Sequence, residues 1–350
     1  MRSVAFVVPG SLSSLTGGSI YDRRMVEGLR TLGWRVDVHE LDSSFPEPSG
    51  AALAGAAAAL AGIADQEITV IDGLVFGAIP DLLEAHRTRL DLVALVHMPL
   101  SLEFGLDAAS AARRRENELR ALGLARVVVV TGHVTTESLT SLGHRAPTPV
   151  LAEPGCDAAP LARGSGGGGV HLLCVAAVTA GKGHEALLRA LADAGGNWTL
   201  TCVGSFTRDP ATGDRLTSLV TSLSLGGRVA FVGELTADQL ASEYDGADVF
   251  VLNTRSETYG MAVSEAIARG LPVVSTRTGA IPDLVGEDAG LLVGVEDDVA
   301  LRDALRTMVT DDRVRTRCRA GAIIARERLR PWTDTAQRFA GILAAIPGHA

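Results

Sequence analysis

Short apolar segments alternate with longer segments of helical periodicity along almost the whole chain. The apolar segments have the length of β-strands, and many end at glycine, proline or a polar residue, as 68–72 and 92–96 do. Strands separated by helices pair in parallel, because a parallel connection requires a crossover of that length. The pattern therefore predicts an α/β protein built from doubly wound sheets with helices on both faces.

The length of 350 residues favours two domains. The clearest linker is 158–169, which ends in four consecutive glycines that neither a strand nor a helix accommodates well. We therefore predict an N-terminal domain over 1–157 and a C-terminal domain over 170–330. A last helix is expected over about 331–346.

Composition narrows the class of protein. Hydrophobic residues make up 47% of the chain, enough for two cores, and no apolar run approaches the ~20 residues that cross a bilayer. The net charge of −9 argues against a nucleic-acid partner. The N-terminus has the pattern of a strand rather than a signal peptide, and the four cysteines are spread widely without metal-ligand spacing. We therefore expect a cytoplasmic protein with reduced, partly buried thiols.

One basic run, Arg113-Arg114-Arg115, bears on membrane association. Glu116 and Glu118 follow it, so we interpret the run as the solvated face of a helix. Docking on an anionic membrane is the alternative.

The segment 256–266 carries the strongest functional pattern. It follows an apolar strand and places Glu257 in a loop and Glu265 about two turns into the next helix. Gly260 lacks a Cβ where a ligand phosphate would approach the backbone. The backbone N–H groups and the dipole at the start of this helix favour an anion such as a phosphate. Two ordinary surface glutamates are the alternative interpretation.

These two glutamates, with Gly260 between them, resemble the Glu-x7-Glu motif of the retaining glycosyltransferases of family 4. The segments 270–275 and 278–283 also resemble the continuation of that motif. The resemblance implies the GT-B fold, in which two Rossmann-like domains face each other across a cleft and the final helix packs back on the N-terminal domain. It also implies a nucleoside-diphosphate-sugar donor and retention of anomeric configuration.

Lys182 is the single lysine among the 32 basic residues. It lies in a Gly-flanked loop between a strand and a helix, which suits a phosphate, although the spacing is not that of a P-loop. The loop resembles the Gly-Arg-Leu-x3-Lys-Gly segment of family 4, but Ala176-Ala177 stand where that family has Gly-Arg. In the family this arginine assists the lysine at the diphosphate. Arg208 and Arg255 are candidates to replace it.

Other candidates lie at strand ends or helix starts, where open α/β sheets bind ligands. Gly17-Gly18 resembles the first loop of the GT-B N-terminal domain, and a plain turn is the alternative. His97 follows the strand 92–96, where a histidine of family 4 contacts the donor sugar; a structural role is the alternative. Gly204 ends the strand 199–203, and Leu235 follows a strand whose end contacts the nucleotide base in relatives.

These residues and the resemblance to family 4 together imply a retaining glycosyltransferase that moves a sugar from a nucleoside-diphosphate sugar to a hydroxyl acceptor, which is a small molecule, a glycan or a lipid-linked group. Lys182 and the helix start would stabilise the departing diphosphate, Glu265 would bind the ribose, and Glu257 would hold the sugar. The predicted catalytic residues are Glu257, His97 and Lys182. The predicted donor-binding residues are Gly17, Gly18, Lys182, Gly204, Arg208, Leu235, Glu257, Thr258, Tyr259, Gly260, Met261 and Glu265. The sequence has no Asp-x-Asp motif, so we expect neither a metal nor a cofactor.

Other functions stay open at this point. A GT-B nucleotide-sugar epimerase would convert the donor without an acceptor, and a non-catalytic sugar- or nucleotide-binding protein would show no turnover. A degenerate glycosyltransferase is a third alternative because of Ala177. A phosphorylase is disfavoured, since Lys182 cannot serve the phosphate loop and also carry pyridoxal phosphate.

Overall fold

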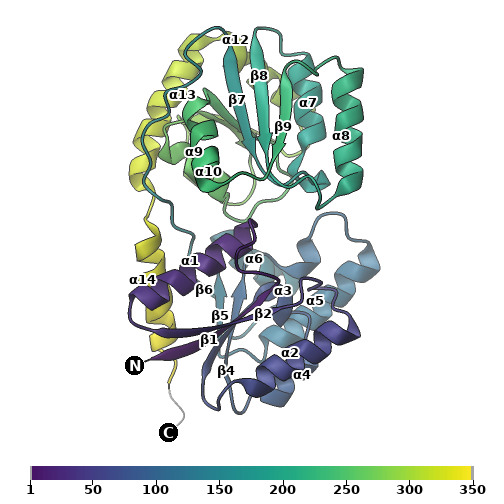
Figure 1. Ribbon diagram of the computed structural model, residues 1–350, viewed down its shortest axis with the longest axis vertical. Helices are drawn as coiled ribbons and strands as arrows, with labels where there is room; N and C mark the ends of the chain where they lie inside the picture. The colour runs from purple at the N-terminus through teal and green to yellow at the C-terminus, as the bar shows by residue number, and fades with distance from the viewer. Residues whose placement is uncertain (1, 348–350) are drawn as a thin grey trace. The chain divides into compact units, whose positions relative to one another are not determined.

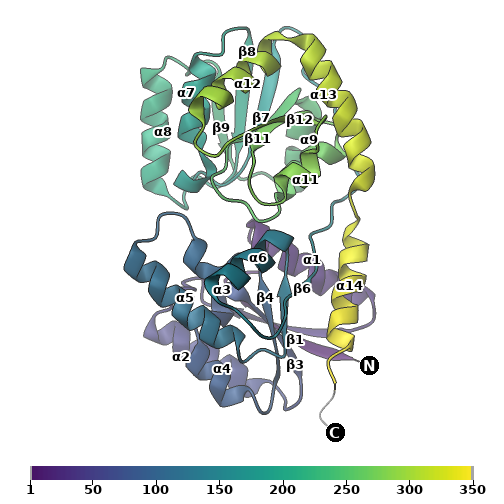
Figure 2. The same ribbon diagram turned by 180° about the vertical axis from the view of Figure 1, so that it is seen from behind.

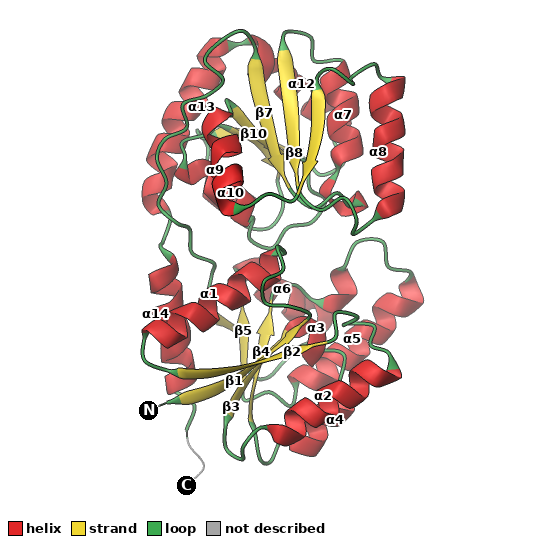
Figure 3. Ribbon diagram, viewed as in Figure 1, coloured by secondary structure: helices red, strands yellow, loops and turns green. Residues whose placement is uncertain are grey.

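The chain forms two α/β units in a computed structural model, which describes residues 2–347. One unit comprises Met1–Gly155 together with Arg330–Ala350, and the other comprises Cys156–Leu329. Each unit contains one six-stranded sheet in which all neighbouring strands run parallel, with helices packed on it (Figure 1, Figure 3). The predicted α/β architecture is therefore confirmed.

The first unit has the strand order β2-β1-β3-β4-β5-β6. Its strands are β1 Ser3–Pro9, β2 Arg35–Leu41, β3 Ile68–Asp72, β4 Asp91–Val96, β5 Val127–Val130 and β6 Val150–Leu151. Its helices are α1 Gly17–Thr31, α2 Gly50–Gly62, α3 Gly73–Phe76, α4 Pro80–His86, α5 Ala108–Leu122, α6 His133–Leu142 and α14 Trp332–Ala344, with a 3-10 turn at Leu100–Leu102.

Alternate residues of β1 show how the first sheet is covered on both faces. Phe6 belongs to a core cluster with residues of α1 and α14, whereas Val7 belongs to a cluster with residues of α2, α3, α4 and α5. Successive side chains of a strand point to opposite faces, so a central strand covered on both sides reads as one continuous apolar run. The rings of Phe6 and Phe339 lie 6.4 Å apart, so α14, from the end of the chain, completes this core. Figure 2 shows α14 beside the edge strand β6.

The second unit has the strand order β12-β11-β10-β7-β8-β9. Its strands are β7 Val170–Val175, β8 Trp198–Val203, β9 Val229–Gly233, β10 Val249–Leu252, β11 Val273–Thr276 and β12 Gly290–Val293. Its helices are α7 His184–Ala192, α8 Pro210–Ser222, α9 Ala237–Gly246, α10 Met261–Ala268, α11 Ile281–Val285, α12 Asp298–Thr310 and α13 Asp312–Ala325, with 3-10 turns at Ala180–Lys182 and Arg326–Arg328. The strand order reverses between β7 and β10, and ligands of open α/β sheets bind at such a point.

The Gly-rich segment 158–169, expected to be a linker, packs on the second unit. Ala162 is buried in its core, the backbone N–H of Gly164 donates to the carbonyl of Asp245, and the N–H of Ser165 donates to the Asp248 carboxylate. The local glycine content predicted a flexible linker, but contacts with residues distant in the sequence fix this segment in place. All four cysteines are free and buried.

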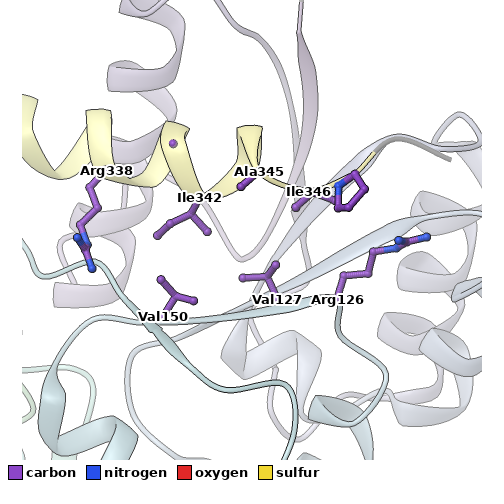
Figure 4. A pocket seen from close by; sticks show the side chains of 9 residues that line it. Arg126, Val127, Val150, Arg338, Ile342, Ala345 and Ile346 are labelled. Atoms are coloured by element: carbon purple, nitrogen blue, oxygen red, sulfur yellow. The ribbon is translucent and has the colours of Figure 1, made fainter. Parts of the chain in front are cut away.

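The lengths of the helices and one surface pocket of the first unit bear on the expectations from the sequence. No helix in the described range 2–347 is long and apolar enough to cross a membrane. A pocket under α14 is lined by Val127, Val150, Ile342 and their neighbours, with Arg126 and Arg338 at its ends (Figure 4). This pocket contains none of the predicted site residues.

The contact between α1 and α14 leads to a test of stability. A Cβ added at Gly28 on α1 would lie 2.4 Å from the Cβ of Ala336 on α14. We expect Gly28→Ala to push the helices apart and to lower the free energy of unfolding by about 1–3 kcal/mol, although alanine favours a helix more than glycine does. The measurement is urea unfolding followed by circular dichroism. The control is Gly55→Ala on α2, whose added Cβ meets open space and which should stabilise by up to about 1 kcal/mol. Equal effects of the two substitutions would contradict this account of the α1–α14 contact.

Candidate functional site

Lys182 and Glu257 form an ion pair at the point where the strand order of the second sheet reverses. The ammonium nitrogen of Lys182 lies 2.8 Å from Oε2 of Glu257, and both side chains are mostly buried. Lys182 ends the 3-10 turn that connects β7 to α7, and Glu257 lies in the loop that connects β10 to α10. The structure therefore brings together two residues that are 75 positions apart in the sequence.

Close backbone contacts explain why these two loops meet. Gly183, which follows Lys182, has a φ of +66°, and a Cβ on it would lie 1.9 Å from the carbonyl oxygen of Asn253. Only glycine permits both this conformation and this approach. The backbone N–H of Arg255 also donates to the carbonyl of Gly181 at 2.8 Å. The turn with Lys182 is thereby fixed against the end of β10.

The start of α10 offers backbone donors beside this pair. Gly260 has a φ of +98° and precedes Met261, the first residue of the helix, and no side chain caps that N-terminus. The helix dipole adds partial positive charge there. Thr258 and Tyr259 belong to the same loop. A Cβ on Gly279 would lie 1.9 Å from the carbonyl oxygen of Glu257, so Gly279 packs closely against this loop. Lys182 and the α10 start therefore form one region suited to an anion.

Glu265 lies in the second turn of α10, half-buried, and is oriented by a residue that sequence reasoning missed. The hydroxyl of the buried Tyr244 donates to Oε2 of Glu265 at 3.0 Å. The guanidinium of Arg269 lies over the Tyr244 ring, 4.4 Å from its centroid. Burial raises the pKa of Tyr244 well above its usual value, and the Glu265 carboxylate adds to the shift. Tyr244 therefore remains a hydroxyl donor.

The other predicted donor residues have varied surroundings. Gly204 has a φ of +146°, and a Cβ on it would lie 2.1 Å from the carbonyl oxygen of Ala176, so the ends of β7 and β8 require glycine here. Leu235 is half-buried against the core. Arg208 is exposed in the loop before α8, whereas Arg255 forms an ion pair with Glu296 at 3.2 Å.

His97, in the first unit, lies between two buried carboxylates. Its Nε2 is 3.1 Å from Oδ1 of Asp22 on α1 and 3.3 Å from Oδ2 of Asp72 at the end of β3. A Cβ on Gly18 would lie 3.3 Å from the His97 ring, whereas one on Gly17 would meet open space. Sequence reasoning found His97 and Gly18 but missed both aspartates. The sequence could have indicated Asp72, because this residue ends a predicted strand at the same edge of the sheet as His97.

The two aspartates determine the charge of His97. Burial alone would lower the pKa of His97, but the charges and hydrogen bonds of Asp22 and Asp72 outweigh it and raise the pKa to about 10. Burial raises the pKa of Asp22, although His97 acts in the opposite direction. His97 is therefore an imidazolium at neutral pH, with its proton on Nε2 directed at the carboxylates.

Two groups of side chains among residues 2–347 have ligand atoms close enough for a metal ion. They are Asp22, Asp72 and His97, and Cys174, His184 and Cys202, each with ligand atoms within 4.8 Å of one another. An imidazolium has no lone pair to give to a metal on its protonated nitrogen. A metal ion in the first group would therefore have to displace the proton on Nε2 of His97.

The charge of His97 can be tested by a conservative substitution. We expect Asp22→Asn to lower the pKa of His97 from about 10 towards its ordinary value, because one of the two carboxylates is lost. The measurement is an NMR titration of the imidazole carbon-bound protons. The matched control is Asp81→Asn, an exposed carboxylate of the same unit, which should leave the titration unchanged. An unaltered titration in Asp22→Asn would show that this carboxylate does not hold the charge.

The same shift predicts a pH dependence of stability. A raised histidine pKa contributes stability that is fully present below about 6.5 and is lost as the pH rises through about 10. We therefore expect the free energy of unfolding of the first unit to fall over this range, and to fall less in Asp22→Asn. Urea unfolding at a series of pH values measures both, and parallel curves for the two proteins would contradict the expectation.

Comparison with known proteins finds similarity mainly in the second unit. Residues 164–324 match the family model for glycosyl transferases group 1. The D-inositol 3-phosphate glycosyltransferase of Corynebacterium diphtheriae is 32% identical over 148 residues, which are 41% of this chain and 35% of that protein. The sulfoquinovosyl transferase of Arabidopsis thaliana is 40% identical over 97 residues, which are 27% of this chain and 19% of that protein. These matches therefore span only about a third or less of each relative.

Solved structures extend the likeness to the whole chain at the level of the fold. Sucrose-phosphate synthase from Thermosynechococcus elongatus has a TM-score of 0.84 with 22% identity, over 98% of each chain. Anabaena HepE in complex with UDP and glucose has a TM-score of 0.76 with 17% identity, over 98% of this chain and 100% of that one. As the Glu-x7-Glu and Lys-Gly segments predicted, residues 164–324 are similar to the glycosyl transferases group 1, and the chain has the GT-B fold.

Proposed function

We propose that this chain is a retaining glycosyltransferase that moves a sugar from a nucleoside-diphosphate sugar to a hydroxyl acceptor without a metal ion. The observation that carries the proposal is the Lys182–Glu257 pair at 2.8 Å, inside the family-matched residues 164–324. Relatives named as glycosyltransferases and the HepE structures with UDP and UDP-glucose support a nucleotide-sugar donor.

The diphosphate would bind at Lys182 and the start of α10. Without a donor the ammonium of Lys182 is neutralised by Glu257, so the site holds no unpaired buried charge. A bound diphosphate offers the ammonium a more highly charged partner, and the N–H groups after Gly260 supply further donors. These positive groups would stabilise the charge that develops on the leaving diphosphate, which is the task a metal ion performs elsewhere.

The nucleoside would bind along α10 and the neighbouring strand ends. Tyr244 holds one oxygen of Glu265, and the carboxylate so oriented would accept hydrogen bonds from ribose hydroxyls. Leu235 would contact the base. Gly204 holds the ends of β7 and β8 together at this edge of the sheet, because its missing Cβ admits the carbonyl oxygen of Ala176. Arg208 and the backbone of Thr258, Tyr259 and Met261 would complete the phosphate contacts.

Two groups would act on the sugars. Glu257 would hold the donor sugar through its hydroxyls or near its anomeric carbon once Lys182 has turned to the phosphate. In the first unit, the imidazolium of His97 would present Nδ1 to a substrate hydroxyl, while Asp22 and Asp72 hold Nε2. Gly17 and Gly18, expected in a loop, are the first two residues of α1. They would let a substrate approach His97, because Gly18 has no Cβ against the His97 ring.

Diphosphate binding tests the first part of this proposal. We expect one of UDP, GDP, ADP or dTDP to raise the thermal midpoint in the absence of added divalent metal, by mass action on the native state. Lys182→Ala should lower the affinity for that nucleoside diphosphate by about 10- to 100-fold, since it removes a hydrogen bond to a charged group. The matched control is Arg189→Ala, an exposed cation on the following helix α7 that pairs with Glu185 and should change nothing. No stabilisation by any of the four would overturn the proposed donor site.

Turnover distinguishes the candidate functions. With the donor sugar of the nucleotide that binds, a transferase should yield a new glycoside only when an acceptor is present, and NMR should show that the anomeric configuration is retained. A changed sugar nucleotide without any acceptor would instead identify an epimerase. Binding without either product would identify a non-catalytic protein.

Glu257→Gln separates diphosphate binding from transfer. Because Lys182 loses its partner in this variant, we expect nucleoside-diphosphate affinity to stay equal or to rise, while transfer falls by about 10- to 100-fold through the lost contact with the sugar. Isothermal titration with the diphosphate and initial-rate assays measure the two effects. Loss of diphosphate affinity together with activity would show that Glu257 does not act on the sugar alone.

A further inference from the structure

A second cluster of chemically reactive side chains lies inside the second unit and has no role in the proposed transfer. Cys174 on β7, Cys202 on β8 and His184, the first residue of α7, are 1%, 2% and 2% exposed. Cys174 and Cys202 are register partners on neighbouring parallel strands, so their side chains point to the same face of the sheet. His184 reaches them from the helix that covers this face. Residues far apart in the sequence therefore bring two thiols and an imidazole to one buried point.

The spacing of the three ligand atoms suits a single metal ion. The two sulfurs and one ring nitrogen lie within 4.8 Å of one another, and Sγ of Cys174 is 3.7 Å from Nε2 of His184. Zinc bonds of about 2.3 Å to sulfur and about 2.0–2.1 Å to nitrogen, at angles between tetrahedral and trigonal, separate S from N by about 3.6–3.8 Å. Cys174 and His184 already stand at that separation.

The weak hydrogen bonding of the buried His184 also leaves Nε2 available to an ion. Its Nε2 faces the sulfur of Cys174, and its Nδ1 is buried without a hydrogen-bond partner among the described residues. A thiol is a weak hydrogen-bond partner, so the buried imidazole recovers little of the hydration it loses. A coordinate bond would give Nε2 a stronger partner than the thiol of Cys174. The alternative is a hydrogen-bonded cluster that holds only protons.

We propose that Cys174, His184 and Cys202 form a binding site for one thiophilic d10 cation, either Zn²⁺ or Cu⁺. Thiolate and imidazole ligands select these ions over the hard cations Mg²⁺ and Ca²⁺. Binding replaces the thiol protons, which pass to the solvent. The ion would tie the start of α7 to β7 and β8 and thereby fix Gly183 and Lys182, the two residues before His184. It would stabilise the fold, and it would leave the transfer itself free of a metal ion.

Metal uptake by the reduced protein tests this site. The protein as isolated, without chelator, is analysed for zinc and copper. Protein stripped of metal under reducing conditions is then titrated anaerobically with Zn²⁺, with Cu⁺, and with Co²⁺ as a spectroscopic substitute for zinc. We expect one equivalent of metal, a thiolate-to-cobalt charge-transfer absorption and a higher thermal midpoint with the preferred ion. Mg²⁺ should produce none of these changes.

Matched cysteine variants locate the binding. Cys174→Ala and Cys202→Ala should each lose the cobalt absorption and the thermal stabilisation. Cys318→Ala removes another buried thiol of the same unit, on α13, and should keep both. His184→Gln, which retains a polar side chain, should weaken uptake by at least tenfold and serves as the readout if the cysteine variants do not fold.

Three results would overturn the proposed metal site. Reduced wild-type protein that takes up none of the ions contains no such site. Equal uptake by wild type and His184→Gln places the metal elsewhere. A disulfide between Cys174 and Cys202 in the isolated protein, with no uptake after its reduction, would identify a redox pair instead of a metal site.

Discussion

Backbone contacts that only glycine permits hold together the loops at the carboxyl ends of the second sheet. A Cβ at Gly183 would lie 1.9 Å from the Asn253 carbonyl oxygen, one at Gly204 would lie 2.1 Å from the Ala176 carbonyl oxygen, and one at Gly279 would lie 1.9 Å from the Glu257 carbonyl oxygen. Three loops that follow different strands are thus pressed against their neighbours. Lys182 can meet Glu257 only because its turn is fixed in this way.

The charges at the two candidate centres are held by different means. Lys182 has one partner, Glu257, on a loop, and its long side chain can exchange that partner for a phosphate by rotation. His97 is held by two buried carboxyl groups on separate elements, Asp22 and Asp72, and its ring cannot leave them without removing the partner that they share. The first cation is therefore suited to accompany a departing anion, and the second is suited to hold one fixed orientation.

The sequence predicted local features well, such as strand bounds and the loops that carry motifs. The strand 68–72 has the predicted bounds, because an apolar run between polar neighbours carries its own limits, and the loops around Lys182 and Gly260 were found from contiguous motifs. The partners Asp22, Asp72 and Tyr244 were missed, since parallel strand order and helix packing bring them to the site from distant positions. The widely spread cysteines showed no metal spacing for the same reason: register across two parallel strands is not visible in the intervals between residues. The four glycines after Ser165 predicted a tether, although contacts with Asp245 and Asp248 fix the segment that they end.

The absence of the family's arginine at Ala177 is best understood from the remaining cations. Arg255 already pairs with Glu296, and its backbone N–H is bound to Gly181, so moving it towards a phosphate would break an existing ion pair. Arg208 is exposed, and its loop follows β8 directly after Gly204, at the same edge of the sheet as the turn with Lys182. An exposed guanidinium gives up only hydration when it binds a phosphate in two-point geometry. Of the two arginines, Arg208 would therefore lose less free energy if it bound the phosphate beside Lys182.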